Sequence, residues 1–288
     1  MIRLFIFLIL SFLKPIEAKI MAGKATTLIT PFSGSSSAGF SSRMGIGIEE
    51  VAKDLEASAL FLNIENKKMI FCCVDHLGIT DKIYKEICRR VRMYPKFENV
   101  DVYVFSSHTH SGEGGFVEIP VVGRFFLGKY DEFAVDLFID RILSVIISSA
   151  GNLKEVSFGI GCGIAPGLSV LRGPLKEKKI GPSQEVCVIK LNDTNNNPFA
   201  VIFNYASHPV IKGQKEMSFS PDWVGYARDY IKDCTQGKAQ AFFINGAQGD
   251  VSTVREGSGE EFCRRFGEKM GRIVMDIYQK IETKNGRC

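Results

Sequence analysis

The sequence predicts an α/β fold with a β-sheet core built from two similar halves and flanked by helices. Three observations support this prediction. Pairs of apolar, strand-like runs occur twice around short polar turns. Other segments carry apolar residues three or four positions apart, which is the period of a helix. The order of hairpin, helix and strand is the same in both halves of the chain, so we expect one arrangement to be used twice.

The first half begins with apolar runs at residues 58–64 and 68–74, separated by the polar turn 65–67. Two such runs around a short turn are typical of a β-hairpin. Apolar residues four positions apart between 83 and 91 then predict a helix with one buried face. Residues 100–105 form another strand-like run, which completes the first half.

The second half repeats this order. Residues 185–191 and 199–205 predict a hairpin on either side of an Asn-rich turn. A helix is expected to begin at Pro221, with Ser220 as its N-cap, because proline is favoured at the first helical position. Residues 239–244 are strand-like and match the last strand of the first half.

Two longer helices complete the expected domain. Apolar residues from 134 to 146 predict a helix that faces the core, and those from 262 to 277 predict the last helix. Ser258 and Glu261 have the spacing of a capping box at its start. Four strands end where a polar, glycine-rich or histidine-bearing loop begins, so we expect the functional site at the carboxyl ends of the strands. The prediction is a single domain over residues 22–288.

Composition is that of a folded protein. The 288 residues are 45% hydrophobic and 24% charged, which excludes disorder over most of the chain. Lysine and arginine number 36 against 32 acidic residues, giving a net charge of +4. Because this balance leaves no dense basic stripe, a nucleic-acid partner is not indicated.

The first eighteen residues have the pattern of an export signal. Arg3 precedes an apolar run over residues 4–13, which is shorter than the roughly 20 residues that span a bilayer as a helix. Pro15 and the small residue Ala18 follow. The pattern favours a signal peptide at residues 1–18 and a secreted or periplasmic protein. An uncleaved anchor or a buried strand is the alternative.

Cysteine usage is compatible with export but does not identify pairs. The even number, eight, permits disulfides in an exported chain. No Cys-x-x-Cys spacing occurs, so a thiolate zinc site is not indicated. Cys72, Cys73 and Cys187 lie in apolar runs, where cysteine acts as a small hydrophobic side chain.

Histidine is scarce and clustered, with only His76, His108, His110 and His208 in the chain. His108 and His110 follow a strand-like run, and residues two apart in an extended segment share a face. Both rings can therefore reach one metal or one substrate, although a surface turn is the alternative. His208 ends the matching strand of the second half. It joins the same site if both halves place their loops on one side, and a single satisfied histidine is equally compatible.

Five more residues are candidates because they stand near strand ends or in polar loops. In the loop Gly246–Ser252, Ser252 is a candidate nucleophile or substrate ligand, and Asp250 is placed to orient an imidazole. Arg172 lies in a glycine- and proline-rich loop and is a candidate ligand for a substrate oxygen. Asp75 follows a strand, and Asp222 lies in the first turn of a helix, which stabilises a carboxylate by itself. Turns and solvated side chains are the alternative for this group.

Histidines and carboxylates without thiolates suit a zinc ion that keeps an open position for water. Such an ion lowers the pKa of bound water to about 7 and polarises a carbonyl group. The residues alone therefore predict an exported, metal-dependent hydrolase.

Six blocks of the sequence are similar, in order, to motifs of the neutral (alkaline, non-lysosomal) ceramidase family, in its catalytic N-terminal region. The most specific is Ser-His-Thr-His-Ser-Gly at 107–112, which resembles the family's THTHSGPGG block. Asn-Gly-Ala-Gln-Gly-Asp-Val-Ser at 245–252 resembles the NGxxGDVSP signature. The other four blocks are the AG…ITP opening (22–31), a strand (54–60), Asp-His-Leu-Gly (75–78) and His208 followed by Asp222 and Gly-Tyr-Ala (225–227).

This resemblance implies hydrolysis of the amide bond of an N-acylsphingosine (ceramide) to a fatty acid and a sphingoid base, with Zn²⁺ as cofactor. His108 and His208 match the family's zinc ligands, and His110 matches a further active-site histidine. Ser252 matches the serine implicated in catalysis, and Arg172 aligns loosely with a family arginine. In this reading a zinc-activated water attacks the acyl carbonyl, while His110 handles a proton or contacts the oxyanion.

The sequence also departs from the family pattern. The family takes a Glu and a Tyr zinc ligand from beyond the GDVS loop, a region that the present sequence does not include. Asp222, Asp250 and Asp75 are candidates to replace them, and Thr253 stands where the family has proline. The expected site therefore has metal ligands His108, His208 and Asp222, catalytic residues His110 and Ser252, and substrate ligands Arg172, Asp250 and Asp75.

Two alternatives to a ceramidase stay open. One is a zinc hydrolase that acts on another amide or an ester, and the other is a non-catalytic paralogue that binds a lipid. Contact with a membrane surface is compatible with the ceramidase hypothesis, and the sequence does not predict the oligomeric state.

Overall fold

The computed structural model describes residues 19–65, 67–118, 122–173 and 181–284, so the predicted export signal lies outside the described residues. Eight strands form the main sheet, in the order β13-β11-β10-β8-β1-β5-β6-β7. Their bounds are β1 Ile20–Leu28, β5 Glu56–Ile64, β6 Lys67–Val74, β7 Val100–Ser106, β8 Lys154–Ile164, β10 Glu185–Asp193, β11 Pro198–Tyr205 and β13 Gln240–Asn245. The helices of four or more residues are α2 Asp81–Arg92, α3 Val122–Leu127, α4 Glu132–Ser149, α5 Trp223–Cys234 and α6 Glu260–Lys280.

Both halves of the sheet have the same topology, which confirms the predicted α/β fold with two similar halves. In the first half, β5 and β6 form an antiparallel hairpin, and α2 connects β6 to its parallel neighbour β7. In the second half, β10 and β11 form the hairpin, and α5 connects β11 to the parallel strand β13. The prediction of a single domain over 22–288 stays a prediction, which the shared sheet supports.

The sheet is folded on itself, a feature that the sequence analysis did not predict. Among the described residues, strand pairing within the sheet joins its two halves only between β1 and β8, through three residue pairs at 20–22 and 154–156. By contrast, β1 pairs with β5 through nine residue pairs. Past this short joint, Lys24 Nζ of β1 donates to the carbonyl oxygen of Phe199 at 2.8 Å, which ties the first half to the second.

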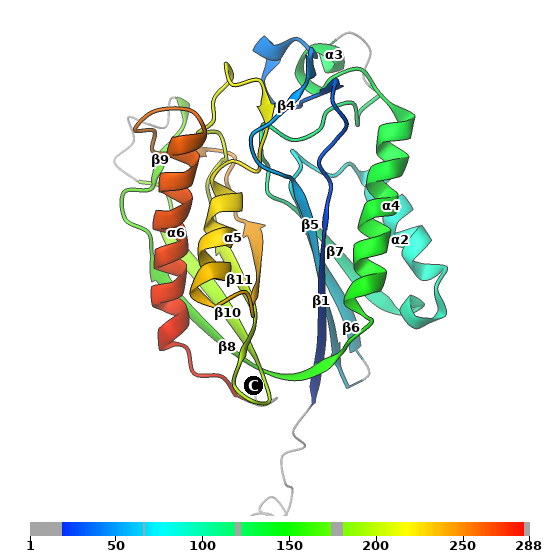
Figure 1. The fold of residues 1–288 in the computed structure, drawn as a ribbon, viewed down its shortest axis with the longest axis vertical. Coiled ribbons are helices and arrows are strands. Elements are labelled where there is room, and N and C mark those ends of the chain that lie inside the picture. Colours follow the sequence, from blue (N-terminus) through cyan, green and yellow to red (C-terminus); the bar gives the residue numbers. More distant parts are fainter. Residues whose placement is uncertain (1–18, 66, 119–121, 174–180, 285–288) are drawn as a thin grey trace, which may run out of the picture.

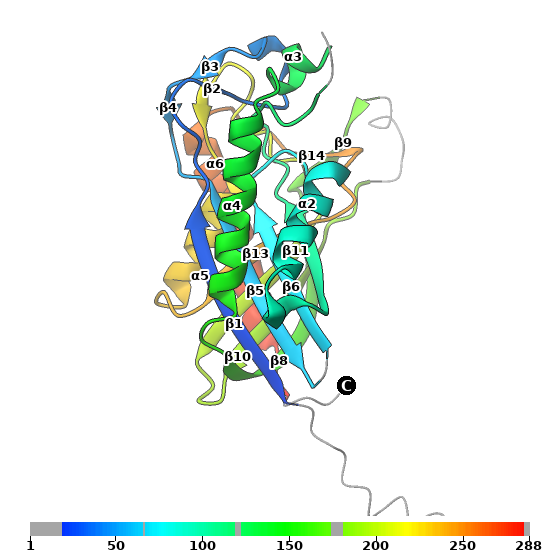
Figure 2. The same ribbon diagram turned by 90° about the vertical axis from the view of Figure 1, so that its right-hand side faces the viewer.

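The protein has four layers: α2 with α4, the first half-sheet, the second half-sheet, and α5 with α6. Alternate residues of each strand pack into different cores. Leu60 and Cys73 of the first half pack with Ile202 and Phe242 of the second, between the two half-sheets. Phe61 and its neighbours face α2 and α4, whereas Phe203 and its neighbours face α5 and α6. Figures 1 and 2 show these helix pairs on the outside, with the strands between them.

Short strands and 3-10 helices lie in the segments that connect the main elements. Three two-stranded pairs occur, β2 with β3, β4 with β12, and β9 with β14. Their bounds are β2 Ser35–Ser36, β3 Gly47–Ile48, β4 Glu50–Val51, β9 Ser169–Leu171, β12 Ser218–Phe219 and β14 Val251–Thr253, and the 3-10 helices are η1 Ser41–Arg43 and η2 Pro95–Phe97. Within the described residues, no helix is both long and apolar enough to cross a membrane.

Two predicted helix starts are wrong. Helix α5 begins at Trp223, and its N-cap is Asp222, whose side chain accepts from the Trp223 N–H, so Ser220 is not the cap. The Ser220 hydroxyl is instead used as a donor to Glu260. Helix α6 begins at Glu260 after Gly259, which makes no side-chain cap, so the predicted capping box of Ser258 is absent.

One predicted role for a cysteine is also wrong. Cys187 of β10 lies opposite Cys162 of β8 and forms a disulfide with it, rather than filling the core. Cys72 and Cys73 are buried and unpaired, as expected for small hydrophobic side chains. The sequence pattern failed at Cys187 because a strand that is apolar overall still presents alternate side chains to its other face.

A buried ion pair joins the two halves. Asp75, which follows β6, is fully buried, and its carboxylate accepts from Arg228 of α5 at 3.0 and 2.5 Å. The same carboxylate also accepts from the Glu56 N–H at 2.9 Å. The bidentate geometry and the extra hydrogen bond compensate both charges for the loss of water.

Replacing Asp75 with alanine is therefore expected to lower the free energy of unfolding by about 3–5 kcal/mol, because the buried Arg228 loses its bidentate partner and keeps only the more distant Glu56, at 3.7 Å. Urea unfolding measures the change, and the double variant Asp75→Ala/Arg228→Met should recover most of it. Asp101→Ala is the matched control, since Asp101 lies 3.9 Å from Lys67 on the surface. Equal losses at positions 75 and 101 would contradict this interpretation.

Candidate metal centre

The loops that follow the strands of both halves meet at one end of the molecule. Asn245, at the end of β13, donates from Nδ2 to the carbonyl oxygen of Ser107, which follows β7, at 3.0 Å. Thr109 donates from Oγ1 to the carbonyl oxygen of Ser220 at 2.7 Å. These bonds hold the histidine-bearing loop of the first half against the second, as the strand-end prediction requires.

Three histidines converge at this junction. The ring centres of His108 and His208 lie 4.8 Å apart, those of His108 and His110 5.1 Å, and those of His110 and His208 5.6 Å. One ring nitrogen from each lies within 4.8 Å of those of the others. His108 has a φ of 67°, which a non-glycine residue rarely adopts and which is typical of functional sites.

The ring of His110 is positioned by packing. Both of its ring nitrogens are buried and have no hydrogen-bond partner in the described residues. Its ring packs on Phe40 at 5.0 Å between centres and on the backbone of Gly39, where an added Cβ would lie 2.6 Å from the ring. Buried polar atoms normally have partners, so the unpaired nitrogens indicate a ligand at this position.

His208 is oriented by its own loop. Its Nδ1 lies 2.9 Å from the carbonyl oxygens of both Gln248 and Val251, so this nitrogen carries the proton. The lone pair is consequently on Nε2, the nitrogen that points into the cluster. Arg172 lies there, with Nη1 donating to that Nε2 at 2.7 Å.

Because Arg172 occupies the lone pair that a metal would use, Arg172→Met is expected to raise the affinity for Zn²⁺ by about tenfold, which corresponds to about 1.4 kcal/mol. Competition titration against a chromogenic chelator measures the affinity. Arg255→Met is the control, because Arg255 is exposed and lines the same surface pocket as Arg172 but does not contact a histidine. Unchanged or weaker binding in Arg172→Met would contradict the expected competition.

The protonation states suit metal binding. Burial, together with the neighbouring His208, lowers the pKa of His108 to about 4. Burial also lowers the pKa of His110 to about 3, with contributions from His108 and His208. The pKa of His208 is lowered mainly by burial. At pH 7 all three rings are therefore neutral, which is the form that binds a metal ion.

The residues present fit the predicted metal. Zinc prefers imidazole nitrogens, and catalytic zinc sites commonly use three protein ligands and an open position. The cluster offers three neutral imidazoles. The lone pair of His208 is directed by two carbonyl groups, and the ring nitrogens of His110 have no hydrogen-bond partner in the described residues. Carbonyl partners of this kind fix the tautomer of a metal-binding histidine.

Ser252 and Asp250 lie beside the cluster. Ser252 belongs to β14 and forms a backbone bridge with His208, whereas Val170 of β9 pairs with it on the other side. The Asp250 side chain is exposed, and its carbonyl oxygen accepts from the Arg172 N–H at 2.7 Å. The backbone thus brings Ser252 next to a predicted metal ligand, while Asp250 positions Arg172 through its main chain.

Two predicted carboxylates have other roles. Asp222 is buried, and its oxygens accept from the N–H groups of Lys212 and Trp223 at 2.9 and 2.8 Å, so it caps α5 and is not part of the ligand cluster. Burial raises its pKa. Asp75 is engaged by Arg228 and is not available to a substrate. His76 is buried, and its ring packs on Phe116.

Arg43 is a site residue that the sequence analysis missed. It is 2% exposed and donates to the carbonyl oxygen of His110 at 2.8 Å and to the Ser111 hydroxyl at 3.2 Å. It also donates to the carbonyl oxygens of Gly213 and Glu216 in the second half. Its neighbours in sequence are serines and glycines of a loop, so no pattern marked it as buried.

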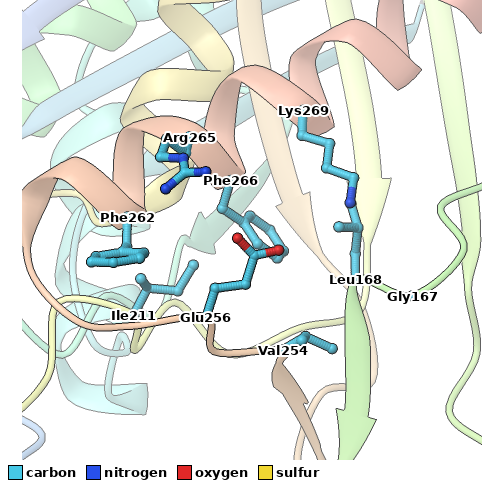
Figure 3. Close-up of a pocket in the computed structure, with 9 residues that line it drawn as sticks. All are labelled: Gly167, Leu168, Ile211, Val254, Glu256, Phe262, Arg265, Phe266 and Lys269. Atoms are coloured by element: carbon cyan, nitrogen blue, oxygen red, sulfur yellow. The ribbon is translucent and has the colours of Figure 1, made fainter.

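Two pockets adjoin the centre. One, of about 310 Å³, opens beside His108 and is lined mainly by the apolar residues Leu77, Ile79, Phe116, Val117 and Leu127. The other, of about 360 Å³, includes Arg172 and Ser252 in its lining. A third pocket, of about 230 Å³, lies between α6 and the segment after β14 (Figure 3), and none of the predicted site residues lines it. The first two are therefore the ones that can serve the centre.

Glu113 is a buried carboxylic acid near the histidine loop. Its side chain is 7% exposed, and burial raises its pKa to about 7, against a smaller opposing effect of Arg141. In the unfolded chain the same group ionises near pH 4.5. Its raised folded-state pKa favours folding at pH values below 4.5, and that advantage is lost as the pH rises to 7.

Glu113→Gln is thus expected to make the protein relatively more stable at pH 8 than at pH 4, by about 3 kcal/mol in the free energy of unfolding relative to wild type. Denaturant unfolding at both pH values measures the difference. Glu98→Gln, at an exposed position, is the control and should follow wild type. A constant offset between Glu113→Gln and wild type at both pH values would show that the carboxyl group is ionised normally.

Comparison with known proteins agrees with the motifs. The family model "Neutral/alkaline non-lysosomal ceramidase, N-terminal" matches residues 55–269. Neutral ceramidase B of Dictyostelium discoideum is 27% identical over 186 residues, which cover 56% of this chain and 26% of the relative. Neutral ceramidase A of the same organism is 22% identical over 219 residues, covering 69% and 30%.

The fold is shared with a solved structure. The crystal structure of neutral ceramidase from Pseudomonas aeruginosa matches with a TM-score of 0.79 and 19% identity, covering 91% of this chain and 45% of that one. The chain thus spans less than a third of the length of the Dictyostelium relatives and under half of the solved chain. With the family model matching most of its length, the chain belongs to the neutral/alkaline non-lysosomal ceramidase family.

Proposed function

We propose that the protein is an exported, zinc-dependent amidohydrolase that cleaves the amide bond of ceramide to a fatty acid and a sphingoid base. The observation that carries this proposal is the convergence of His108, His110 and His208, with Arg172 and Ser252 beside them, in a chain of the ceramidase family. The two alternatives, another amide or ester substrate and a non-catalytic lipid-binding paralogue, are outcomes of the test below.

Zinc held by His108 and His208 would supply a Lewis acid for the acyl carbonyl and would acidify water. His110, neutral and without another partner, then accepts the proton of the attacking water and returns it to the leaving amine. Arg172, once displaced from His208, donates to the developing oxyanion. Ser252 contacts the substrate from the β14 side, where its backbone adjoins His208.

The pocket next to His108 supports a lipid substrate. Its apolar lining suits an alkyl chain, and its position beside the predicted metal ligand brings such a chain to the reacting carbonyl. The polar groups of the centre are then left to orient the amide. This division between apolar wall and few polar groups is typical of pockets that bind amphiphilic small molecules.

Export is proposed from two independent features. Residues 1–18 have the pattern of a signal peptide. The disulfide between Cys162 and Cys187 is of the kind that persists in oxidising compartments. Detection of the protein in the extracellular or periplasmic fraction, cleaved near Ala18, would test this part of the proposal.

The function is tested by incubating purified residues 19–288 with a fluorescent N-acylsphingosine near neutral pH. Zinc-dependent turnover that a chelator abolishes is the expected result, and Ser252→Ala should lower kcat/KM by at least about a hundredfold. A folded, zinc-loaded protein that does not cleave the substrate would exclude ceramide and leave another amide or ester. A protein that binds ceramide but no zinc would support the non-catalytic alternative.

A further inference from the structure

The carboxylate of Glu260, the first residue of α6, accepts hydrogen bonds from three side chains. Its Oε1 accepts from the Ser220 hydroxyl at 2.9 Å and from the Tyr226 hydroxyl at 2.8 Å. Its Oε2 accepts from Lys212 Nζ at 2.7 Å. The Lys212 side chain is 1% exposed, and among the described residues Glu260 is its only ion-pair partner. A charge buried this deeply needs a counter-ion, so Glu260 fixes the position of Lys212.

Lys212 belongs to the loop that carries His208. Its N–H donates to the Asp222 carboxylate at 2.9 Å, and its carbonyl oxygen accepts from the Gly259 N–H at 3.2 Å. The Val210 N–H donates to the His208 carbonyl oxygen at 3.1 Å, so the segment between the histidine and the lysine is tightly bent. A displacement of Lys212 is therefore transmitted to His208 over only four residues.

Ser220, the second partner of Glu260, holds the histidine loop of the first half. Its carbonyl oxygen accepts from Thr109 Oγ1 at 2.7 Å, and its N–H donates to the carbonyl oxygen of Ser111 at 3.0 Å. Thr109 lies between the two histidines of that loop. Thr109, Ser111 and Ser220 are all buried, so water does not compete for these hydrogen bonds. The side chain of Ser220 thus reaches Glu260 while its backbone holds the loop.

The sheet by itself does not set the distance between the two histidine loops. The joint between β1 and β8 lies at the opposite end of the sheet, because Ile20 pairs with Ile64, beside the start of β6, whereas the first histidine loop follows the end of the parallel strand β7. Hydrogen bonds at the loops must set the distance instead. Arg43 and Asn245 supply two such links between the halves, and Glu260 supplies a third.

We propose that Glu260 is a positioning residue that sets the separation of His108 and His208 for one Zn²⁺ ion. Zinc–nitrogen bonds are short, so two ligands from different halves must be held close together when the ion binds. A network that is already in place lowers the free-energy cost of ordering them. This inference rests on the proposed function through its zinc site alone, because neither ceramide nor its hydrolysis enters the argument.

The affinity of the purified protein for Zn²⁺, after its metal has been removed with a chelator, tests this role without catalysis. Competition titration is expected to show a loss of at least about tenfold in Glu260→Gln, the usual effect of changing a residue that orients a metal ligand. Lys212→Met should show a similar loss. The double variant Glu260→Gln/Lys212→Met should lose little more than either single variant, because all three changes break one connection.

Glu261→Gln is the matched control. Glu261 is exposed in the same first turn of α6 and pairs with Arg264 on the surface. The control therefore removes one carboxylate from the same helix end without touching either histidine loop. It should bind zinc as wild type does, and an equal loss in Glu261→Gln and Glu260→Gln would overturn the inference.

A role in stability alone predicts a different result for Glu260→Met/Lys212→Met. This variant removes both buried charges together and should recover most of the stability that Glu260→Gln loses in thermal unfolding. Its zinc affinity should nevertheless stay low. The visible absorption spectrum of the Co²⁺-loaded protein reports the geometry of the ligands and should also differ from that of wild type. A folded double variant with wild-type zinc affinity and cobalt spectrum would overturn the positioning role.

The outcomes distinguish this inference from the proposed function. Equal zinc affinity in wild type and Glu260→Gln, in a protein that cleaves ceramide, would overturn the positioning role and leave the function intact. Weaker zinc binding by Glu260→Gln, in a protein that does not cleave ceramide, would support the positioning role and exclude the ceramidase function. Wild type that does not bind zinc would overturn both.

Discussion

His208→Ala is expected to lower the affinity for Zn²⁺ by at least about a hundredfold and kcat/KM for ceramide by about a thousandfold or more. His208 contributes the one ring nitrogen whose lone pair is directed into the cluster by two carbonyl groups. Without it, His108 is the only one of the two proposed zinc ligands that remains, and a single imidazole does not hold the ion firmly. Metal content after dialysis and competition titration measure the first effect, and initial rates measure the second.

The variant Asp222→Asn distinguishes the loss of a zinc ligand from the loss of a helix cap. Asp222 was predicted as a metal ligand, but its carboxylate caps α5 and accepts from Lys212 and Trp223. The asparagine variant should therefore keep its zinc and lose about 1 kcal/mol of stability, the usual value of a helix cap. Zinc retained by His208→Ala, or lost from a folded Asp222→Asn, would reverse these assignments.

The hairpins, the repeated halves and the histidine loop could be predicted because each depends on short-range pattern. Alternating and 3.6-residue periods placed strands and helices, and His108 and His110 lie in one loop, so their proximity follows from spacing. The folding of the sheet at the β1–β8 joint could not be predicted in this way. The fold depends on which face of each strand is covered by the other half. Strands β5 and β6 carry apolar side chains on both faces, so the sequence does not distinguish the two faces.

The two misassigned carboxylates show a related limit. Asp75 and His76 are adjacent at the end of β6. Asp75 was assigned to the site, yet its partner Arg228 is 153 positions away in the chain. Only the packing of α5 against the first half reveals this pair. A carboxylate near a strand end is therefore compatible with a functional role and with a buried ion pair. The sequence does not distinguish these roles, because the cation that would pair with it is distant in the chain.

Arg43 is the case in which sequence carried no signal and the expected effect is large. It donates six hydrogen bonds, to side chains of Ser37 and Ser111 and to the carbonyl oxygens of His110, Gly213, Gln214 and Glu216. Burial lowers its pKa to about 10, so it is still charged at pH 7. A planar guanidinium can reach acceptors on several sides at once, which a lysine ammonium cannot.

Arg43→Met is accordingly expected to lower the free energy of unfolding by about 5 kcal/mol, because several buried acceptors lose their only charged donor. Arg43→Lys should lose about half as much and Arg92→Met, at an exposed position on α2, almost nothing. In the lysine variant, which remains folded, ceramide hydrolysis should still fall, since the carbonyl of His110 is no longer held in place. Wild-type activity in Arg43→Lys would mean that packing on Phe40 and Gly39 positions His110 without help from the arginine.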